Sequence, residues 1–331
     1  MNTMRTGQMF GVNDMRCVEL AIPELRDGEM LVKTDMASIC GSDLHLVCHG
    51  AGLTHPFPCP HGYPGHEAIG EVVDPGTTDV AAGTKVLCFP AVVPGMTEGF
   101  AEFQRIRPEF TLPLPSSGVS DAELLMAQQL GTVIFASRKR PIDMVGRTAL
   151  VIGQGSAGLF WSYLLKRQGA ARVIVADLSP ARLAASPGFG ADVVINSGEE
   201  DLEAAIADLT GGLGADYVIE AVGRREVLYQ SIELVKVDGD LMWFGLPDSD
   251  DSVPISYAKF FRKRLTATST YGAQTEADAV SFQTALDLIS GGHIDVSPLL
   301  SHVYPVDEID TAFTVANEPA DAGALKVSVS F

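Results

Sequence analysis

Between residues 148 and 244 the sequence alternates short apolar runs of strand length with segments of helix length. The apolar runs cover 148–152, 172–176, 193–195, 217–220 and 240–244, and helices are expected up to 168, from 180, over 202–209 and near 227–235. Strands joined by helix-length crossovers form a parallel sheet, and nearly continuous apolar strands are typical of a sheet covered on both faces. This part of the chain is therefore predicted to be a doubly wound α/β domain.

A glycine-rich loop directly follows the first of these strands and opens a helix. Its sequence is Gly153, Gln154, Gly155, Ser156, Ala157 and Gly158. In this pattern the first glycine allows a tight turn, the second lets the backbone approach a pyrophosphate, and the third lets helix and strand pack closely. The helix N-terminus then offers free N–H groups to the anion. The loop alone could be a glycine turn of any α/β fold, but its context predicts a dinucleotide site.

Asp177 ends the next strand, where a carboxylate can bind both adenosine-ribose hydroxyls and repel a 2′-phosphate. This position favours NAD over NADP. The alternative role is as the N-cap of a helix starting at Pro180, which Asp177 or Ser179 could supply. Arg182 could accept a phosphate, but with Asp177 intact it is interpreted as flanking the adenosine ribose.

The remainder of the chain has a different pattern of apolar residues, glycine and proline. Residues 1 to about 130 read as β-rich, with apolar runs such as 30–34 and 68–73 interrupted by Gly and Pro. A helix is predicted over 121–137, capped by Asp121 or Ser120. The tail is mixed, with helices expected over 279–289 and 307–315 and a final strand over 326–329.

Composition excludes several classes of protein. Lys and Arg number 23 against 42 Asp and Glu, a formal net charge of −19, so phosphate backbones and anionic lipids are repelled. We therefore expect no nucleic acid and no membrane partner. There is no apolar run of about 18 residues and no secretory signal pattern. Five cysteines, an odd and small number, argue against a disulfide framework, and a cytoplasmic location is expected.

Histidine and cysteine are concentrated in one short segment. Five of the seven histidines and three of the five cysteines lie between residues 40 and 66. Cys40-Gly-Ser-Asp-Leu-His45 is followed 25 residues later by Gly65-His66-Glu67. A thiolate, an imidazole and a carboxylate suit zinc, and three protein ligands leave a catalytic ion one open position.

Taken together, these pieces resemble the zinc-dependent medium-chain dehydrogenases/reductases, which are alcohol dehydrogenase-like, on the polyol and threonine dehydrogenase side of that family. The resemblance rests on the two metal motifs, Gly83-x-Lys-Val, the Gly153 loop, Asp177, Glu220-Ala-Val-Gly223 and the closing Lys326-Val-Ser-Val, in family order over nearly the whole chain. It implies a Rossmann cofactor domain over 131–272 and a β-rich, GroES-like catalytic domain over 1–130 and 273–331.

The resemblance also implies roles for individual residues of the metal centre. Cys40, His66 and Glu67 correspond to the catalytic zinc ligands. Gln128 occupies the position of a further Glu or Gln ligand, where an amide oxygen would bind more weakly or through water.

Further positions correspond to the proton relay and the cofactor site. Ser42 matches the hydroxyl that passes on the substrate proton, His45 the outer end of that relay, and Asp43 the carboxylate that orients the ligand histidine. The predicted cofactor-binding residues are Gly153, Gly155, Ser156, Ala157, Gly158, Asp177, Arg182, Val222 and Gly245.

The sequence departs from the family in two places. The usual structural zinc needs four closely spaced cysteines after Cys88, and the chain has no cysteine beyond that position. One catalytic zinc and no structural zinc are therefore predicted. The loop 49–61 is unusual in its content of histidine and cysteine. We interpret it as a polar loop near the substrate, with a second metal site on Cys48, His55, Cys59 and His61 as the alternative.

The predicted function is hydride transfer between NAD and the alcohol group of a polyol, sugar or amino alcohol. The alternatives are a dehydrogenase of a hydrophobic secondary alcohol, a zinc-free quinone or enoyl reductase, and a non-catalytic nucleotide-binding protein. The intact metal and relay residues argue against the last two. The expected partners are a small-molecule alcohol and further copies of the chain, as a dimer or tetramer.

Overall fold

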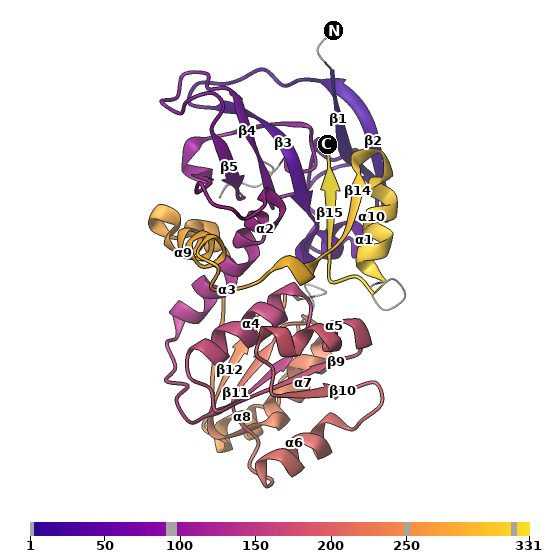
Figure 1. The fold of residues 1–331 in the computed structure, drawn as a ribbon. Coiled ribbons are helices and arrows are strands. Elements are labelled where there is room, and N and C mark those ends of the chain that lie inside the picture. Colours follow the sequence, from indigo (N-terminus) through magenta and orange to yellow (C-terminus); the bar gives the residue numbers. More distant parts are fainter. Residues whose placement is uncertain (1–2, 91–97, 248–251, 319–322) are drawn as a thin grey trace. The chain divides into compact units, whose positions relative to one another are not determined.

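The structure, a computed structural model, describes residues 3–90, 98–247, 252–318 and 323–331. The chain divides into two compact units (Figure 1). Unit 1 comprises Met1–Thr132, Gly272–Pro319 and Ala324–Phe331, and the main segment of unit 2 is Val133–Tyr271. Each unit has its own sheet and its own core.

Unit 2 is built on a six-stranded parallel sheet with the order β10-β9-β8-β11-β12-β13. The strands are β8 (Thr148–Ile152), β9 (Arg172–Asp177), β10 (Val193–Asn196), β11 (Ala215–Glu220), β12 (Val235–Trp243) and β13 (Thr266–Ser269). The order reverses beside β8, the first strand, which is the Rossmann arrangement with its switch point after β8. The predicted doubly wound sheet is confirmed.

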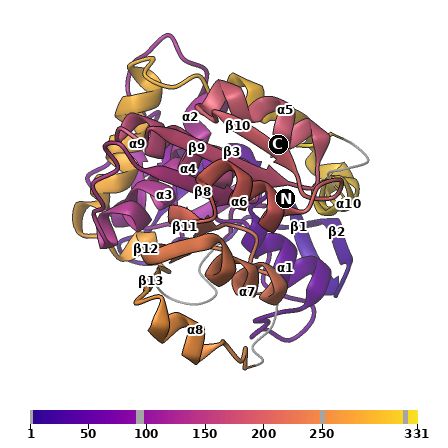
Figure 2. The same cartoon turned by 90° about the horizontal axis from the view of Figure 1, so that it is seen from below.

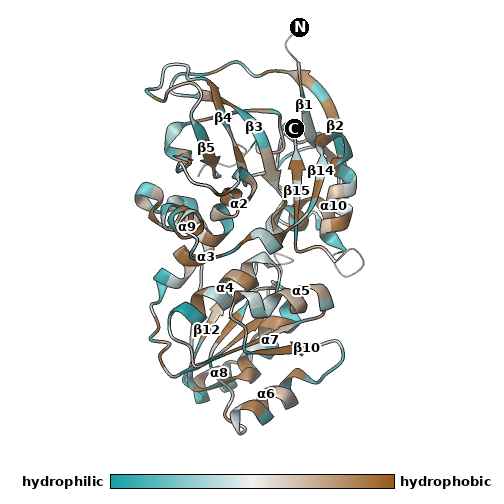
Figure 3. Ribbon diagram, viewed as in Figure 1, coloured by the Kyte–Doolittle hydropathy of each residue, from teal (hydrophilic) through white to brown (hydrophobic). Residues whose placement is uncertain are grey.

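Helices cover both faces of this sheet, as buried parallel strands require. They are α4 (Ser156–Arg167), α5 (Pro180–Ala185), α6 (Leu202–Thr210), α7 (Arg225–Leu234) and α8 (Tyr257–Arg262). Helices α4 and α5 pack against the same short 3₁₀ turn, whereas α6 packs against α7. The strands are mostly brown in Figure 3, while the covering helices carry apolar and polar residues side by side. No helix in the described residues is long and apolar enough to cross a bilayer.

Two features of unit 2 differ from the sequence-based expectation. Strand β13 and helix α8 carry no clear signal, because Thr-Ala-Thr-Ser is not an apolar run and α8 has no buried residue. Strand β13 lies at the sheet edge, where one side of the backbone is unpaired and the sequence need not be apolar (Figure 2). Strand β12 also begins five residues earlier than expected, at Val235.

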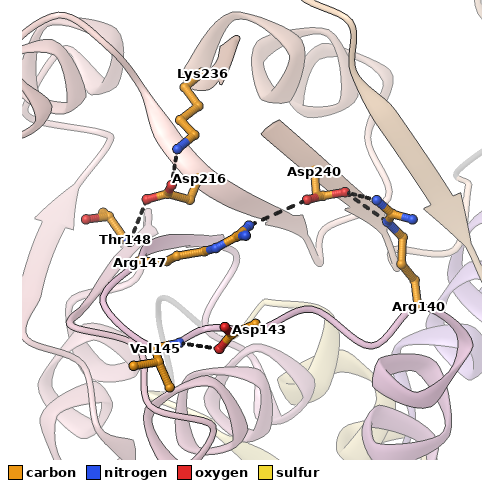
Figure 4. Close-up of polar contacts among 8 residues, drawn as sticks. All are labelled: Arg140, Asp143, Val145, Arg147, Thr148, Asp216, Lys236 and Asp240. Atoms are coloured by element: carbon orange, nitrogen blue, oxygen red, sulfur yellow. Dashed lines mark hydrogen bonds and ion pairs between the residues drawn. The ribbon is translucent and has the colours of Figure 1, made fainter. Parts of the chain in front are cut away.

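Ion pairs join the amino ends of the central strands (Figure 4). Asp216 on β11 accepts a hydrogen bond from the Thr148 backbone at 2.8 Å and pairs with Lys236 on β12. Asp240 on β12 accepts two hydrogen bonds from the Arg140 guanidinium, at 2.8 and 2.6 Å. The Arg140 and Lys236 side chains are 41% and 37% exposed, so each pair contributes at most about 1 kcal/mol and supports a register that strand pairing already sets.

Unit 1 contains a sheet with the order β14-β15-β3-β4-β5-β7, in which β6 also pairs with β3. The strands are β3 (Met30–Ser38), β4 (Ala68–Asp74), β5 (Lys85–Cys88), β6 (Phe103–Ile106), β7 (Thr111–Pro113), β14 (Leu300–Pro305) and β15 (Lys326–Ser330), beside a hairpin of β1 (Thr3–Gly11) and β2 (Asp14–Ala21). Figure 1 shows that β15, from the end of the chain, lies beside β3, from its beginning.

The helices of unit 1 are α1 (Gly41–His49), α2 (Asp121–Leu125), α9 (Val280–Ser290) and α10 (Ile309–Asn317), and α3 (Ala127–Lys139) begins there. Hairpin, sheet and α10 share one apolar core that includes Met9, Met15, Phe100 and Phe313. The single helix expected over 121–137 is two helices, α2 and α3, with Met126 as the C-cap of α2. Ser120 caps α2 by accepting the Glu123 N–H at 3.3 Å, as one of the two proposed caps.

Candidate functional site

The ends of two paired strands bring the metal motifs together in unit 1. Strand β3 ends at Ser38, two residues before Cys40, and β4 begins at Ala68, directly after Glu67. The strands are antiparallel, with Ala37 opposite Ala68, so the end of one meets the start of the other. The Ser38 N–H donates to the Glu67 carbonyl at 2.9 Å and continues the ladder into the motif.

Cys40, His66 and Glu67 form a group that could hold a metal ion. The Cys40 Sγ, one imidazole nitrogen of His66 and one carboxylate oxygen of Glu67 lie within 4.8 Å of one another. In the part of the chain that the structure describes, this is the one such group of His, Cys, Asp and Glu. Its thiol, imidazole and carboxylate fit zinc, and so does the Glu67 Oε1, which is buried without a hydrogen-bond partner.

The orientation of His66 is fixed by its Nδ1 atom. That atom lies 3.0 Å from Asp43 Oδ1 and 3.1 Å from the Pro64 carbonyl, and Asp43 is fully buried. Two acceptors on Nδ1 hold the tautomer in which Nε2 is free to bind a metal. Asp43 Oδ2 accepts the Cys40 N–H at 2.9 Å, so one carboxylate positions both ligand residues.

Glu67 is ionised although it is buried. Burial raises its pKa, but the charges of Lys326 and His66 and the hydrogen bonds from Lys326 and Ser38 outweigh this and lower the pKa below its usual range. The Lys326 ammonium lies 2.7 Å from Glu67 Oε2. The carboxylate is therefore available as an anionic ligand.

The predicted relay residues lie on α1, whose first residue follows Cys40. Ser42 Oγ is 3.4 Å from His66 Nε2, the nitrogen left for the metal. His45 follows Ser42 by three residues and shares its side of the helix, because residues i and i+3 are neighbours on a helix surface. Both side chains are half-buried. The role of His45 in a relay stays a prediction.

Gln128 is buried at the start of α3, and its place among the metal ligands stays a prediction. Its neighbour Gln129 has the clearer connection to the group. Gln129 Oε1 accepts a hydrogen bond from Lys326 Nζ at 3.4 Å. Sequence reasoning gave no role to Gln129, since nothing in the motif distinguishes it from Gln128.

Cys48, His55, Cys59 and His61 do not belong to the group of Cys40, His66 and Glu67. Cys48 and Cys59 belong to the apolar core, and burial raises the pKa of the Cys48 thiol to about 11. His55 packs edge-on against the Tyr63 ring, and His61 Nε2 lies 3.2 Å from Glu98 Oε1. The described residues therefore do not bring these four side chains into one metal group. The stretch 89–99, which the sequence also suggests as a wall of the substrate pocket, includes residues 91–97, and these lie outside the described part.

In unit 2 the glycine loop has the close contacts that its spacing predicts. Gly153 has a φ of 93°, in the left-handed region that favours glycine. A Cβ at Gly158 would lie 1.8 Å from the Gly153 carbonyl oxygen, so no other residue fits there. Ser156 and Ala157 begin α4, and Gly155 is its N-cap. The first N–H groups of α4 are thus left for an anion.

Two further predicted cofactor residues lie beside this loop. The Val222 side chain would come within 2.8 Å of a Cβ at Gly153. A Cβ at Gly245 would lie 2.1 Å from the Gly223 N atom, so these two segments need glycine to pass each other. Glu220 holds the Val222–Gly223 turn by accepting both N–H groups, at 2.7 and 2.8 Å.

Asp177 faces the same loop. Its Oδ2 accepts the Gln154 N–H at 2.6 Å, and its Oδ1 accepts the Ser179 N–H at 2.8 Å. Ser179, not Asp177, is the N-cap of α5. The Arg182 guanidinium would lie 3.9 Å from a Cβ at Gly155, and its Nε is buried without a hydrogen-bond partner in the described residues. Carboxylate and guanidinium thus flank the position where the loop would hold a dinucleotide.

Gln154 is a residue of this loop that the motif does not single out. Its side chain is fully buried, donates to the Gly153 carbonyl at 3.0 Å and accepts from Ser186 and Ser162 at 3.0 and 3.3 Å. It therefore fixes the loop to α4 and to the turn after α5. Gln154 occupies a variable place of the glycine pattern, so only the tertiary structure reveals this role.

Comparisons with known proteins identify the families that match the two parts of the chain. Residues 26–116 match the family described as "Alcohol dehydrogenase GroES-like domain", and residues 157–291 match "Zinc-binding dehydrogenase". The chain belongs to the zinc-type medium-chain dehydrogenases/reductases, and the predicted combination of Rossmann and GroES-like domains is confirmed.

Individual relatives span nearly the whole chain. It is 25% identical to the sorbitol dehydrogenase of Bacillus subtilis over 93% of this chain and 92% of that protein. It is 28% identical to the L-threonine 3-dehydrogenase of Pyrococcus abyssi over 94% and 93%. A zinc-binding dehydrogenase structure from Sinorhizobium meliloti, bound to NADP, superposes with a TM-score of 0.84 at 24% identity over all of both chains.

We predict that replacing Cys40 removes the metal. The purified protein should contain one zinc ion per chain, and Cys40→Ser should contain little, because a hydroxyl is a far poorer zinc ligand than a thiolate. Elemental analysis after gel filtration measures this, with circular dichroism to check the fold. Cys17→Ser is the matched control, since Cys17 contacts Asp307 and not this group.

Two results would contradict this prediction. Full zinc content in Cys40→Ser would remove Cys40 from the ligand set. A reproducible value near two ions per chain for the unmodified protein would point to the histidines and cysteines of the 49–61 loop.

Proposed function

We propose that this protein is a zinc-dependent dehydrogenase that transfers hydride from a polyol, sugar or amino alcohol to NAD. The observation that carries the proposal is the group of Cys40, His66 and Glu67 in a chain that also has the Gly153 loop with Asp177. The similarity to a sorbitol and a threonine dehydrogenase supports the substrate class. In this proposal 1–130 with 273–331 is the catalytic domain and 131–272 the cofactor domain.

The mechanism assigns a task to each side chain near the ligands. Cys40, His66 and Glu67 would hold zinc, with Gln128 as a further, weaker ligand. A bound zinc ion supplies the Lewis acidity that makes an alcohol easier to deprotonate near neutral pH. Asp43 keeps His66 Nε2 directed to that ion. Ser42 Oγ, 3.4 Å from the same nitrogen, accepts the proton of the substrate alcohol, and His45 passes it outward.

The cofactor supplies the hydride acceptor, and the chain supplies its position. The Gly153 loop and the start of α4 bind the pyrophosphate, with Val222 and Gly245 beside them. Asp177 uses one lone pair of each oxygen for a backbone N–H, and a carboxylate can accept about four hydrogen bonds, so capacity remains for the ribose hydroxyls. Its charge disfavours a 2′-phosphate, although a structural relative is bound to NADP.

The test of function is a substrate screen with zinc-loaded protein. Polyols, aldoses, amino alcohols including threonine, and simple alcohols are each incubated with NAD or NADP while the reduced cofactor is measured. We expect turnover of a polyol, sugar or amino alcohol, and a preference for NAD of at least about tenfold, equivalent to ~1.4 kcal/mol. Turnover by the metal-free protein, or equal use of NADP, would contradict the zinc or the Asp177 assignment, respectively.

The relay predicts that His45→Gln keeps zinc and fold but slows turnover. The loss should lie within the roughly 10²–10⁴-fold range of a general acid–base group, and it should shrink as pH rises because hydroxide replaces the missing base. Zinc content and turnover across pH measure this. His293→Gln, which changes an exposed histidine after α9, is the control. A zinc-free His45→Gln variant would make His45 a ligand, and unchanged turnover at every pH would exclude it from the relay.

We also propose that the chain self-associates through the β13 edge of unit 2. One side of β13 has no strand partner in the described residues, and the aromatic side chains of Tyr257, Phe261 and Tyr271 nearby are 70%, 67% and 86% exposed. Figure 2 shows α8 beside this edge. An unpaired edge with exposed aromatic residues suits pairing with a second copy.

Sedimentation equilibrium should therefore give the mass of two or four chains. Phe261→Ser should weaken the association, while Leu213→Ser, which removes an equally exposed apolar residue elsewhere on unit 2, should not. A single-chain mass for the unmodified protein would contradict the proposal. We also propose a cytoplasmic location, where the Cys40 thiol stays reduced, and cell fractionation can check it.

A further inference from the structure

Lys326 is a buried cation beside the metal group. Its side chain is 3% exposed, and its Nζ lies 2.7 Å from Oε2 of Glu67, which is 1% exposed. The strand register places it there: Ser328 on β15 pairs with Ser38 on β3, and the Ile39 N–H donates to the Val327 carbonyl at 2.9 Å. The first residue of β15 thus lies beside the end of β3, where Cys40 follows.

The two carboxylate oxygens of Glu67 have different environments. Oε2 accepts hydrogen bonds from both Lys326 and Ser38. Oε1 is buried and has no hydrogen-bond partner in the described residues. A buried acceptor without a partner is costly, so Oε1 is the oxygen that a cation would satisfy.

With a divalent cation bound, the charges around the group sum to zero. Asp43, Glu67 and the Cys40 thiolate of the metal-bound form are three negative charges, and Lys326 is one positive charge. Without Lys326 a bound zinc ion would leave a buried net negative charge.

We propose that Lys326 is a positioning residue of the metal centre: it holds Oε2 of Glu67, so that the carboxylate meets the metal through Oε1 alone. The inference rests on the proposed metal site. Lys326 competes with the metal for Glu67, and its charge repels the cation. Its loss should therefore let both oxygens approach the ion, bind the metal more firmly and weaken its Lewis acidity.

The experiment compares Lys326→Met, Lys326→Arg and the unmodified protein, each loaded with zinc or with cobalt(II). Release of zinc to a chelating dye should be roughly ten- to a hundredfold slower in Lys326→Met, and turnover should fall by a similar factor, the range typical of groups beside metal ligands. The visible spectrum of the cobalt form should change, because the ligand set changes. Lys326→Arg keeps the charge and should restore all three properties.

Two further variants keep the test decisive. Ser38→Ala removes the other donor to Oε2 with little change in volume, and should slow zinc release in the same direction but less. Lys85→Met removes a lysine that pairs with Asp35 and Asp121 in the same unit, and should leave zinc release unchanged.

A purely structural role predicts the opposite sign. If Lys326→Met and Ser38→Ala lose zinc faster than the unmodified protein, or if the cobalt spectrum is unchanged in both, the role of Lys326 is overturned. If Lys326→Met does not fold, Ser38→Ala alone decides by the sign of its effect. Zinc release and the cobalt spectrum need neither substrate nor NAD. An unmodified protein that binds no metal would overturn the proposed function itself.

Discussion

The antiparallel pairing of β3 with β4, and of β3 with β15, is the constraint on which the metal site depends. Each strand supplies its ligand or partner at the same end of the sheet: Cys40 after β3, Glu67 before β4 and Lys326 at the start of β15. The backbone bond from Ser38 to Glu67 continues the ladder into the site. A slip of one residue in either pairing would turn these side chains to the other face of the sheet, so the register itself builds the site.

Electrostatics then makes the site specific for a cation. Removing a buried carboxylate from water is costly unless it is paired, and the site contains two, Asp43 and Glu67. Both oxygens of Asp43 face the candidate ligand residues: Oδ1 lies 3.0 Å from His66 Nδ1, and Oδ2 accepts the Cys40 N–H. Of the two oxygens of Glu67, only Oε2 has a hydrogen-bond partner in the described residues. This asymmetry distinguishes a carboxylate that orients other residues from one that can itself bind a metal.

The predicted dinucleotide site of unit 2 is built on a different principle. It depends on the absence of side chains, at Gly153, Gly158, Gly223 and Gly245, so that backbone segments approach closely. The buried side chain of Gln154 and the carboxylates of Asp177 and Glu220 then hold the loops in place through backbone contacts. Such a site tolerates change in most surrounding side chains, because its shape is a property of the backbone.

The sequence alone determined the alternation of strands and helices in unit 2, the glycine loop with Asp177, and the three residues that the structure brings into one group that could hold a metal ion. These features are local, because a strand, a turn and a metal motif are each encoded by a few consecutive residues. Strand β13 escaped prediction because an edge strand needs no apolar run. The break between α2 and α3 escaped because apolar spacing continues through it. The tertiary structure decided the partners of Glu67 and Gln154, because Lys326 is 259 positions from Glu67 in the sequence and only strand pairing brings them within 2.7 Å.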